Sequence, residues 1–275
     1  MLILHNNIVS RLCTGFTYGI SFQNDLWYVF QNTGRYGRII SFELKIDKNE
    51  YYKFDYKNFN YLGLSAGIHQ IDYYNGVLYA TDTYNNRLII FKGKGKKYFY
   101  PNGKLKNGRR SINYNHFNSI YFNRNKLYMI AHNETVKSNR TSEIYVFSLS
   151  ENHELNFSQL ISTDAKNAHN ISILNDRFIY CDTMDGIVML GEDVFFENKS
   201  FLTRGLSITK EFIAIGGSAF AKREDRLNKD SMVWILDYNG NQKATIELNG
   251  IGQVNEIRCL TGDLALSDSS KNNYT

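Results

Sequence analysis

The chain has 275 residues, of which 43% are hydrophobic, 15% are aromatic and 21% are charged, with a net charge of +5. Many Tyr and Phe beside a single Pro favour a globular, β-rich protein. No apolar run approaches the roughly 18 residues of a membrane span, and we recognise no secretory leader, so we expect a cytoplasmic protein without a membrane partner. The three cysteines, Cys13, Cys181 and Cys259, are too scattered for a disulfide framework or a CxxC metal site.

Six strand-like segments in chain order share a pattern centred on an isoleucine, mostly about 50 residues apart. A short break rich in Asn, Asp or Gly follows each of them, and then a second strand, because these residues tolerate the positive φ of a hairpin turn. Third and weaker fourth strands follow in most units. The pattern predicts an all-β, six-bladed β-propeller of four-stranded antiparallel blades, forming one domain over residues 1–275. The inner strands are expected near Ile20, Ile71, Ile120, Ile173, Ile208 and Ile257.

The last unit ends early, after LALSDSSKNNYT, and the N-terminal segments LILHN and IVSRLC belong to no unit of their own. We therefore expect residues near 2–12 to complete the sixth blade and so to close the ring. Closure of this kind removes two exposed sheet edges.

One end of the predicted blades carries the longer and more charged loops, which favours a functional site there. His69, His116 and His169 begin inner strands at that end. His116 and His169 share one register, four residues before their isoleucines, and Arg204 and Gln253 hold that register in the next two units. His69 lies two residues closer to its isoleucine, with the same side-chain parity.

Three further polar residues end second strands at the same mouth, namely His132, Asp82 and Asp182. For each Asp, the structural interpretation is that it accepts N–H bonds in the following turn, and the functional one is that it binds substrate together with His132. The histidines are either separately hydrogen-bonded structural residues or a shared set of metal ligands or acid–base groups. Imidazoles suit a zinc-like divalent ion.

The stretch LYATDTYNNRLIIF (78–91) resembles the NHL-repeat motif, and FIYCDTMDGIVML (178–190) is a weaker echo of it. The chain as a whole resembles the six-bladed NHL-like propellers, which include gluconolactonase-like hydrolases and amidating lyases. The resemblance to the lyases implies that His69, His116 and His169 are metal ligands and that Arg204 binds a substrate carboxylate. It also implies that Tyr18 or Tyr121 is an acid–base group. For the gluconolactonase-like pattern of a carboxylate with Asn residues, the inner-strand candidate is Glu256 beside Asn255.

Two loops are rich in basic residues, which are either solvated loop charge or a positive rim that attracts an anionic substrate. Nucleic acid is not expected, because the net charge is modest and acids interleave in KREDR. The candidate rim residues are Arg109, Arg110, Lys222 and Arg223.

These features together predict an enzyme that acts in the propeller mouth on a small anionic or sugar-like molecule, by metal-dependent hydrolysis or lyase chemistry. The alternative is a non-catalytic binding or scaffold propeller that uses the same face for a protein or glycan partner.

Overall fold

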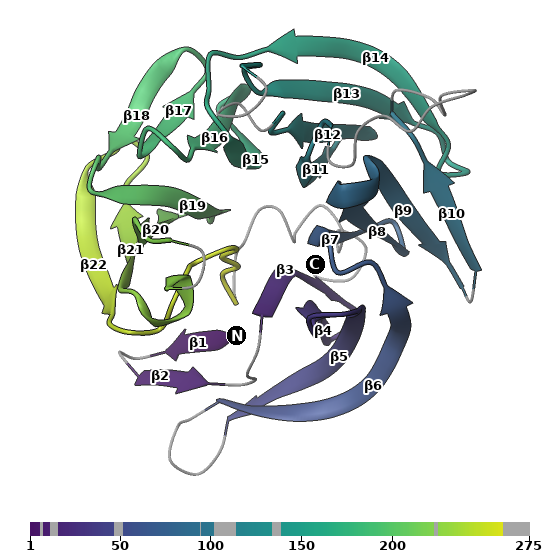
Figure 1. Ribbon diagram of the computed structural model, residues 1–275, viewed down its shortest axis with the longest axis horizontal. Coiled ribbons are helices and arrows are strands. Elements are labelled where there is room, and N and C mark those ends of the chain that lie inside the picture. The colour runs from purple at the N-terminus through teal and green to yellow at the C-terminus, as the bar shows by residue number, and fades with distance from the viewer. Residues whose placement is uncertain are drawn as a thin grey trace.

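The computed structural model describes residues 1–5, 8–11, 16–46, 52–93, 95–101, 114–133, 139–222 and 225–260. Within these ranges the strands form five four-stranded antiparallel sheets and one two-stranded sheet. Figure 1 shows the sheets arranged as blades around a common centre. The predicted all-β propeller architecture is therefore confirmed.

The five blades follow one another along the chain, and each begins with its innermost strand. Blade 1 contains β3 (Phe16–Gln23), β4 (Leu26–Asn32), β5 (Gly37–Ile46) and β6 (Tyr52–Leu64). Blade 2 contains β7 (Ile68–Tyr74), β8 (Val77–Asp82), β9 (Arg87–Lys92) and β10 (Gly95–Phe99). Blade 3 contains β11 (Phe117–Asn123), β12 (Lys126–Ala131), β13 (Glu143–Leu149) and β14 (Leu155–Ser162). Blade 4 contains β15 (Ala168–Leu174), β16 (Arg177–Asp182), β17 (Ile187–Leu190) and β18 (Asp193–Glu197). Blade 5 contains β19 (Phe201–Ile208), β20 (Ile213–Ala219), β21 (Ser231–Leu236) and β22 (Gln242–Leu248).

Two short 3-10 helices, η1 (Thr83–Asn85) and η2 (Arg226–Asn228), lie in the loops between the second and third strands of blades 2 and 5. In the part of the chain that is described, no helix has the length and apolar character needed to cross a membrane.

The predicted hairpin turns between first and second strands are confirmed in blades 1 to 4. Each is a two-residue turn in which φ is positive at both residues. This is the type I′ geometry, whose twist matches the twist of the flanking strands. The turns are Asn24–Asp25, Asn75–Gly76, Arg124–Asn125 and Asn175–Asp176.

The prediction of six four-stranded blades is wrong, because the described chain has five. β1 (Leu2–His5) and β2 (Ile8–Arg11) pair with each other in a two-stranded sheet. Figure 1 shows this sheet in the gap between blade 5 and blade 1. Residues 251–260, which include Ile257, form no strand. The second strand expected for the sixth unit, in residues 261–275, lies outside the described residues.

Neighbouring inner strands are joined by hydrogen bonds from backbone N–H groups to polar side chains of the preceding inner strand. Such bonds satisfy buried backbone donors that no sheet partner reaches. The links are Tyr73 N to Ser21 Oγ (2.9 Å), Ile120 N to Gln70 Oε1 (2.6 Å), Asn170 N to Ser119 Oγ (2.8 Å) and Gly205 N to Asn170 Oδ1 (2.8 Å).

Residues 251–260 bridge blades 5 and 1 by two hydrogen bonds, each between a backbone group and a side chain. The N–H of Val254 donates to Ser218 Oγ in β20 at 3.0 Å. On the other side, Asn255 Nδ2 donates to the carbonyl of Thr17 in β3 at 3.5 Å. The segment therefore joins the two ends of the ring without forming a strand itself.

The hydrophobic core lies between neighbouring blades. Tyr79 and Leu88 of blade 2 pack with Phe117 and Phe147 of blade 3, and all four side chains have no exposed surface. Full burial of a large apolar side chain stabilises a fold by roughly 1.5–3 kcal/mol. The interfaces between blades therefore hold the inner strands in place, and with them the residues at their ends.

Candidate functional site

Four histidine side chains from blades 2, 3 and 4 form a continuous row at the mouth, the end of the ring where inner strands begin and second strands end. His69 lies in β7, His116 just before β11, His132 just after β12, and His169 in β15. Successive ring centroids are 4.9 Å, 4.3 Å and 5.0 Å apart. The prediction that the mouth gathers these histidines is confirmed, and we call this set the histidine row.

Tyr18 of blade 1 extends the histidine row. Its ring stacks on His69 with the centroids 5.6 Å apart and the planes 26° apart. Tyr18 lies in β3, so the row and its extension span four consecutive blades. The candidate acid–base tyrosine is therefore in contact with the imidazoles.

The predicted common register of His116 and His169 is wrong. Counted back from the hairpin turn, the residue equivalent to Ile120 is Ile171, because they pair with Met129 and Tyr180 at the same distance from the turn. His169 thus lies two residues before its isoleucine, as His69 does, whereas His116 lies four before. The sequence offers two isoleucines in NISIL, and only the position of the turn decides between them.

His169 is held in one tautomer by two contacts of its Nδ1. This atom lies 2.8 Å from the carbonyl oxygen of Asn167 and 2.9 Å from Thr183 Oγ1. A carbonyl oxygen only accepts, so we assign the proton of the neutral ring to Nδ1. Nε2 is then the basic nitrogen, on the opposite side of the ring.

The electrostatic surroundings keep His169 neutral. Burial is the largest cause that lowers the pKa of His169 well below 6.5, followed by the positive charge of Arg204 and the other three histidines. Only 6% of the His169 side chain is exposed. A neutral imidazole at pH 7 can accept a proton, as a general base requires.

Arg204 of β19 is partly buried and brings a positive charge close to His169 in the histidine row. Its Nε is buried and has no hydrogen-bond partner among the described residues. Burial lowers the pKa of Arg204, and the nearby Tyr18 and Glu256 act in the opposite direction. A desolvated cation with unsatisfied donor capacity is costly unless an anion compensates it.

Glu256 lies between the inner strands rather than in the histidine row. Its Oε1 forms an ion pair with Arg258 Nη1 at 2.5 Å, and both side chains are 5% exposed. Gln70 Nε2 and Asn170 Nδ2 donate to the same carboxylate at 3.4 Å and 3.5 Å. Glu256 therefore links residues 251–260 to blades 2 and 4. Arg258 neutralises its carboxylate, the group that a divalent ion would otherwise bind.

The two aspartates that end second strands have different surroundings. Asp82 is fully buried and accepts bonds from Asn85 Nδ2 and, at 2.7 Å, from Arg87 Nε. These contacts favour the structural interpretation of Asp82. The donors are side chains, however, and not the backbone N–H groups that we expected. Asp182 accepts a bond from the N–H of Lys166 at 2.8 Å, and burial raises its pKa to about 6.

Several other predicted site residues lie apart from the row or outside the description. Tyr121 is 5% exposed and packs in the core between blades 3 and 4, with Ile130 and Ile144. Lys222 is exposed in the loop between β20 and β21. Arg109, Arg110 and Arg223 lie outside the described residues.

The predicted metal ligands do not converge in this arrangement. In the described part of the chain, no group of three or more His, Cys, Asp or Glu side chains is placed to hold a metal ion. The metal site at His69, His116 and His169 stays a prediction.

Sequence reasoning missed the residues that anchor His169. Thr183 directly follows Asp182 in the repeated motif, and Asn167 has a positive φ of 59° just before β15. A Thr follows the Asp at both positions 83 and 183, and this recurrence is the sequence signal that could have identified Thr183. Thr83 Oγ1 likewise donates to the Phe117 carbonyl of the next blade.

No family model and no curated protein sequence matches the chain. Several solved structures are similar in fold. A structure from a nidogen/laminin complex has a TM-score of 0.62 at 10% identity, covering 94% of this chain and 92% of its own. A candidate gluconolactonase has a TM-score of 0.56 at 12% identity, covering 88% of this chain and 80% of its own.

A catalytically inactive virginiamycin B lyase from Staphylococcus aureus, solved with quinupristin, has a TM-score of 0.51 at 12% identity. It covers 95% of this chain and 79% of its own. Identities this low show the shared propeller fold and no shared activity. The resemblance to this group of propellers is confirmed at the level of the fold.

Proposed function

We propose that the histidine row, with Tyr18 and Arg204, binds a small anionic molecule and acts on it by hydrolysis or lyase chemistry. The observation that carries the proposal is the buried Nε of Arg204, which has no partner among the described residues and belongs to a guanidinium whose charge acts on His169. A bound carboxylate or phosphate would supply the missing acceptor. Arg offers such groups two parallel N–H donors in one plane.

The histidine row would supply the proton transfer. Nε2 of His169 is the acceptor, since Nδ1 is held by Asn167 and Thr183. In hydrolysis it would accept a proton from water, and in lyase chemistry from a carbon next to the anionic group. Tyr18, stacked on His69, is the candidate donor to the leaving group. Similar folds that include a candidate gluconolactonase and a lyase support this class of reaction at the level of the fold.

A zinc-like ion at His69, His116 and His169 is a separate proposal. When bound, such an ion would polarise the substrate or lower the pKa of a water molecule. Metal analysis of the purified protein tests it. A stoichiometry near one that falls in a His116→Ala variant would support it, and a metal content that the variant leaves unchanged would contradict it.

A direct test of the proposed function uses a panel of sugar-acid lactones and carboxylate esters, with product formation followed by NMR. We expect turnover by the wild type and loss of turnover in His169→Gln. Arg204→Lys should melt within a few degrees of the wild type and should weaken binding or turnover by roughly 1.5–3 kcal/mol. If Arg204→Lys instead unfolds the protein while the folded fraction binds normally, Arg204 is a structural residue.

A non-catalytic binding face is the second candidate, because large apolar side chains surround the mouth. Each lies at the start of an inner strand, or in a loop that opens at this end. Clustered exposed apolar residues mark interaction surfaces. The residues are Phe16, Tyr36, Tyr84, Tyr114, Met184, Phe220 and Leu227. If a protein or glycan partner is bound, Tyr36→Ser should weaken that binding, whereas the turnover of a small substrate should not change.

A further inference from the structure

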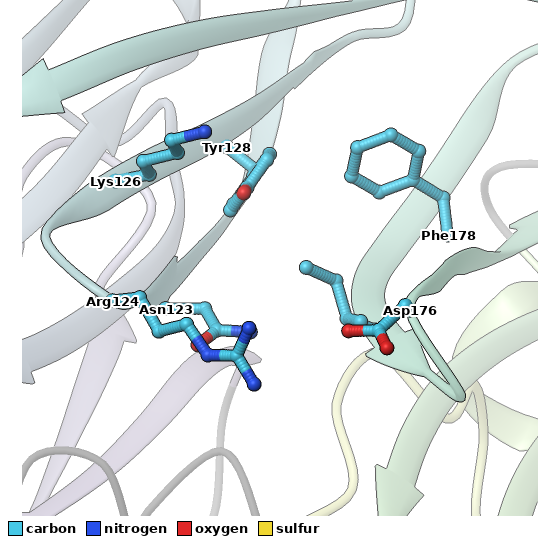
Figure 2. A pocket seen from close by; sticks show the side chains of 7 residues that line it. Asn123, Arg124, Lys126, Tyr128, Asp176 and Phe178 are labelled. Carbon is cyan, nitrogen blue, oxygen red and sulfur yellow. The ribbon is translucent and has the colours of Figure 1, made fainter.

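A hollow lies at the opposite end of the strands from the histidine row. It has a volume of about 190 Å³ and lies between the hairpin turns of blades 3 and 4. Figure 2 shows Arg124, Lys126 and Tyr128 on one side and Asp176 and Phe178 on the other. Ile173 completes its apolar lining. We call this the turn hollow.

The charges of the turn hollow are divided between its two walls. Blade 3 contributes two cations, Arg124 and Lys126, and blade 4 contributes one carboxylate, Asp176. Tyr128 and Phe178, with ring centroids 5.3 Å apart, lie on the same two walls. A ligand that satisfies both walls needs a negative group, a positive group and an apolar part.

Arg124 is an unusual residue for its backbone position. It takes the first place of a type I′ turn with a φ of 47°, where blades 1, 2 and 4 have Asn24, Asn75 and Asn175. Asn adopts this left-handed conformation more readily than Arg does. Local strain of this kind is often found where a side chain has a function.

The size of the turn hollow limits the ligand. Its volume of about 190 Å³ is below the roughly 300–1,000 Å³ of the pockets that bind drug-sized ligands. We propose that the turn hollow binds a free α-amino acid with an apolar side chain. The α-carboxylate would bind Arg124 and Lys126, the α-ammonium would bind Asp176, and the side chain would pack on Tyr128, Ile173 and Phe178.

Four small probes separate these three parts of the recognition. L-phenylalanine carries all of them, N-acetyl-L-phenylalanine lacks the ammonium, L-phenylalaninamide lacks the carboxylate, and glycine lacks the side chain. We expect saturable binding of L-phenylalanine to the full chain by ligand-observed NMR, in the millimolar range or tighter. Each of the other probes should bind at least roughly tenfold more weakly, since each lacks a charge-assisted or apolar contact.

Matched variants place the site. Asp176→Asn should weaken L-phenylalanine and its amide roughly tenfold and leave the N-acetyl compound unchanged. Arg124→Gln should weaken L-phenylalanine and the N-acetyl compound and leave the amide unchanged. Asp25→Asn is the control, because Asp25 has the same place in the blade 1 turn, with a φ of 61° against 58° at Asp176. All three residues are exposed, so the variants should melt like the wild type.

Three outcomes would overturn the proposal. The first is no saturable binding of L-phenylalanine to the wild type at tens of millimolar. The second is binding that neither Asp176→Asn nor Arg124→Gln weakens. The third is binding that Arg204→Gln abolishes and Asp176→Asn leaves unchanged, which would place the amino acid in the mouth.

Discussion

Blades 2 and 4 carry the same strand–turn–strand motif and end their second strands with the same residue, yet the two aspartates behave differently. Asp82 pairs across the sheet with Arg87, and Asp182 pairs in the same way with Ile187. The guanidinium of Arg87 forms an ion pair with Asp82 at 2.7 Å. The Ile187 side chain has no charge to offer Asp182, whose pKa burial raises to about 6.

The two blades differ at two positions near this carboxylate, because Asn85 and Arg87 of blade 2 correspond to Asp185 and Ile187 of blade 4. In blade 2 the carboxylate, Asn85 and Arg87 form a closed set of contacts that fixes the turn. In blade 4 a titratable carboxylate remains next to Thr183, which contacts His169. The blade that lacks the ion pair therefore keeps a buried carboxylate whose pKa is raised to about 6.

Removing the partner in blade 2 should have the largest effect. In Arg87→Met the fully buried Asp82 loses its ion pair, and an unpaired buried charge destabilises by about 3–5 kcal/mol. Urea denaturation at neutral pH measures the change. The double variant Asp82→Asn/Arg87→Met should recover most of the loss, since no charge then remains. A loss below about 1 kcal/mol in the single variant would show that Arg87 is dispensable.

Removing the carboxylate in blade 4 should stabilise the protein. The pKa of Asp182 rises from 3.8 to about 6 on folding, so its ionised form destabilises the folded state, and this penalty grows as pH rises from about 4 through 6. We expect Asp182→Asn to gain about 1–2 kcal/mol near pH 7.5 and nothing near pH 4. Denaturation curves at the two pH values test this, and an equal gain at both would exclude the ionisation of Asp182 as the cause.

His169 should make the protein sensitive to acid. Its pKa lies well below 6.5 in the folded state, so below about pH 6.5 the unfolded chain binds more protons and stability falls. In an Asp182→Asn background, which removes the opposing trend, we expect a loss of about 1 kcal/mol between roughly pH 7 and 5.5. His169→Gln in that background should flatten the profile. An unchanged slope would assign the acid sensitivity to other groups.

Transplanting the blade 2 arrangement should have the smallest effect. Ile187→Arg places a guanidinium opposite Asp182, as Arg87 lies opposite Asp82. A nearby cation lowers the pKa of a carboxyl by about 1–3 units, which NMR titration of Asp182 would detect. We expect a stability gain below about 1 kcal/mol at neutral pH, because the arginine is partly solvated. A pKa of Asp182 that stays near 6 would show that burial and Asp185, rather than the missing cation, set this pKa.

The sequence alone was sufficient for the propeller architecture, the hairpin turns and the location of the mouth. These features depend on local physics, since Asn, Asp and Gly tolerate positive φ and strands alternate between two faces. A repeated unit also brings equivalent positions to a common end. His69, His116, His132, His169 and Arg204 are therefore candidates for the mouth from their places in the repeat, whereas Tyr18 is a candidate only through the family resemblance.

Only the tertiary structure decided the rest, because it depends on contacts between strands and between blades. The surroundings of each aspartate separated Asp82, which forms an ion pair with Arg87, from Asp182, whose pKa burial raises to about 6. The number of blades depended on whether residues 251–260 pair as a strand or bridge two blades by single hydrogen bonds. The turn hollow needs Arg124 and Asp176 to face each other across two turns about 50 residues apart, a contact that neither turn specifies by itself.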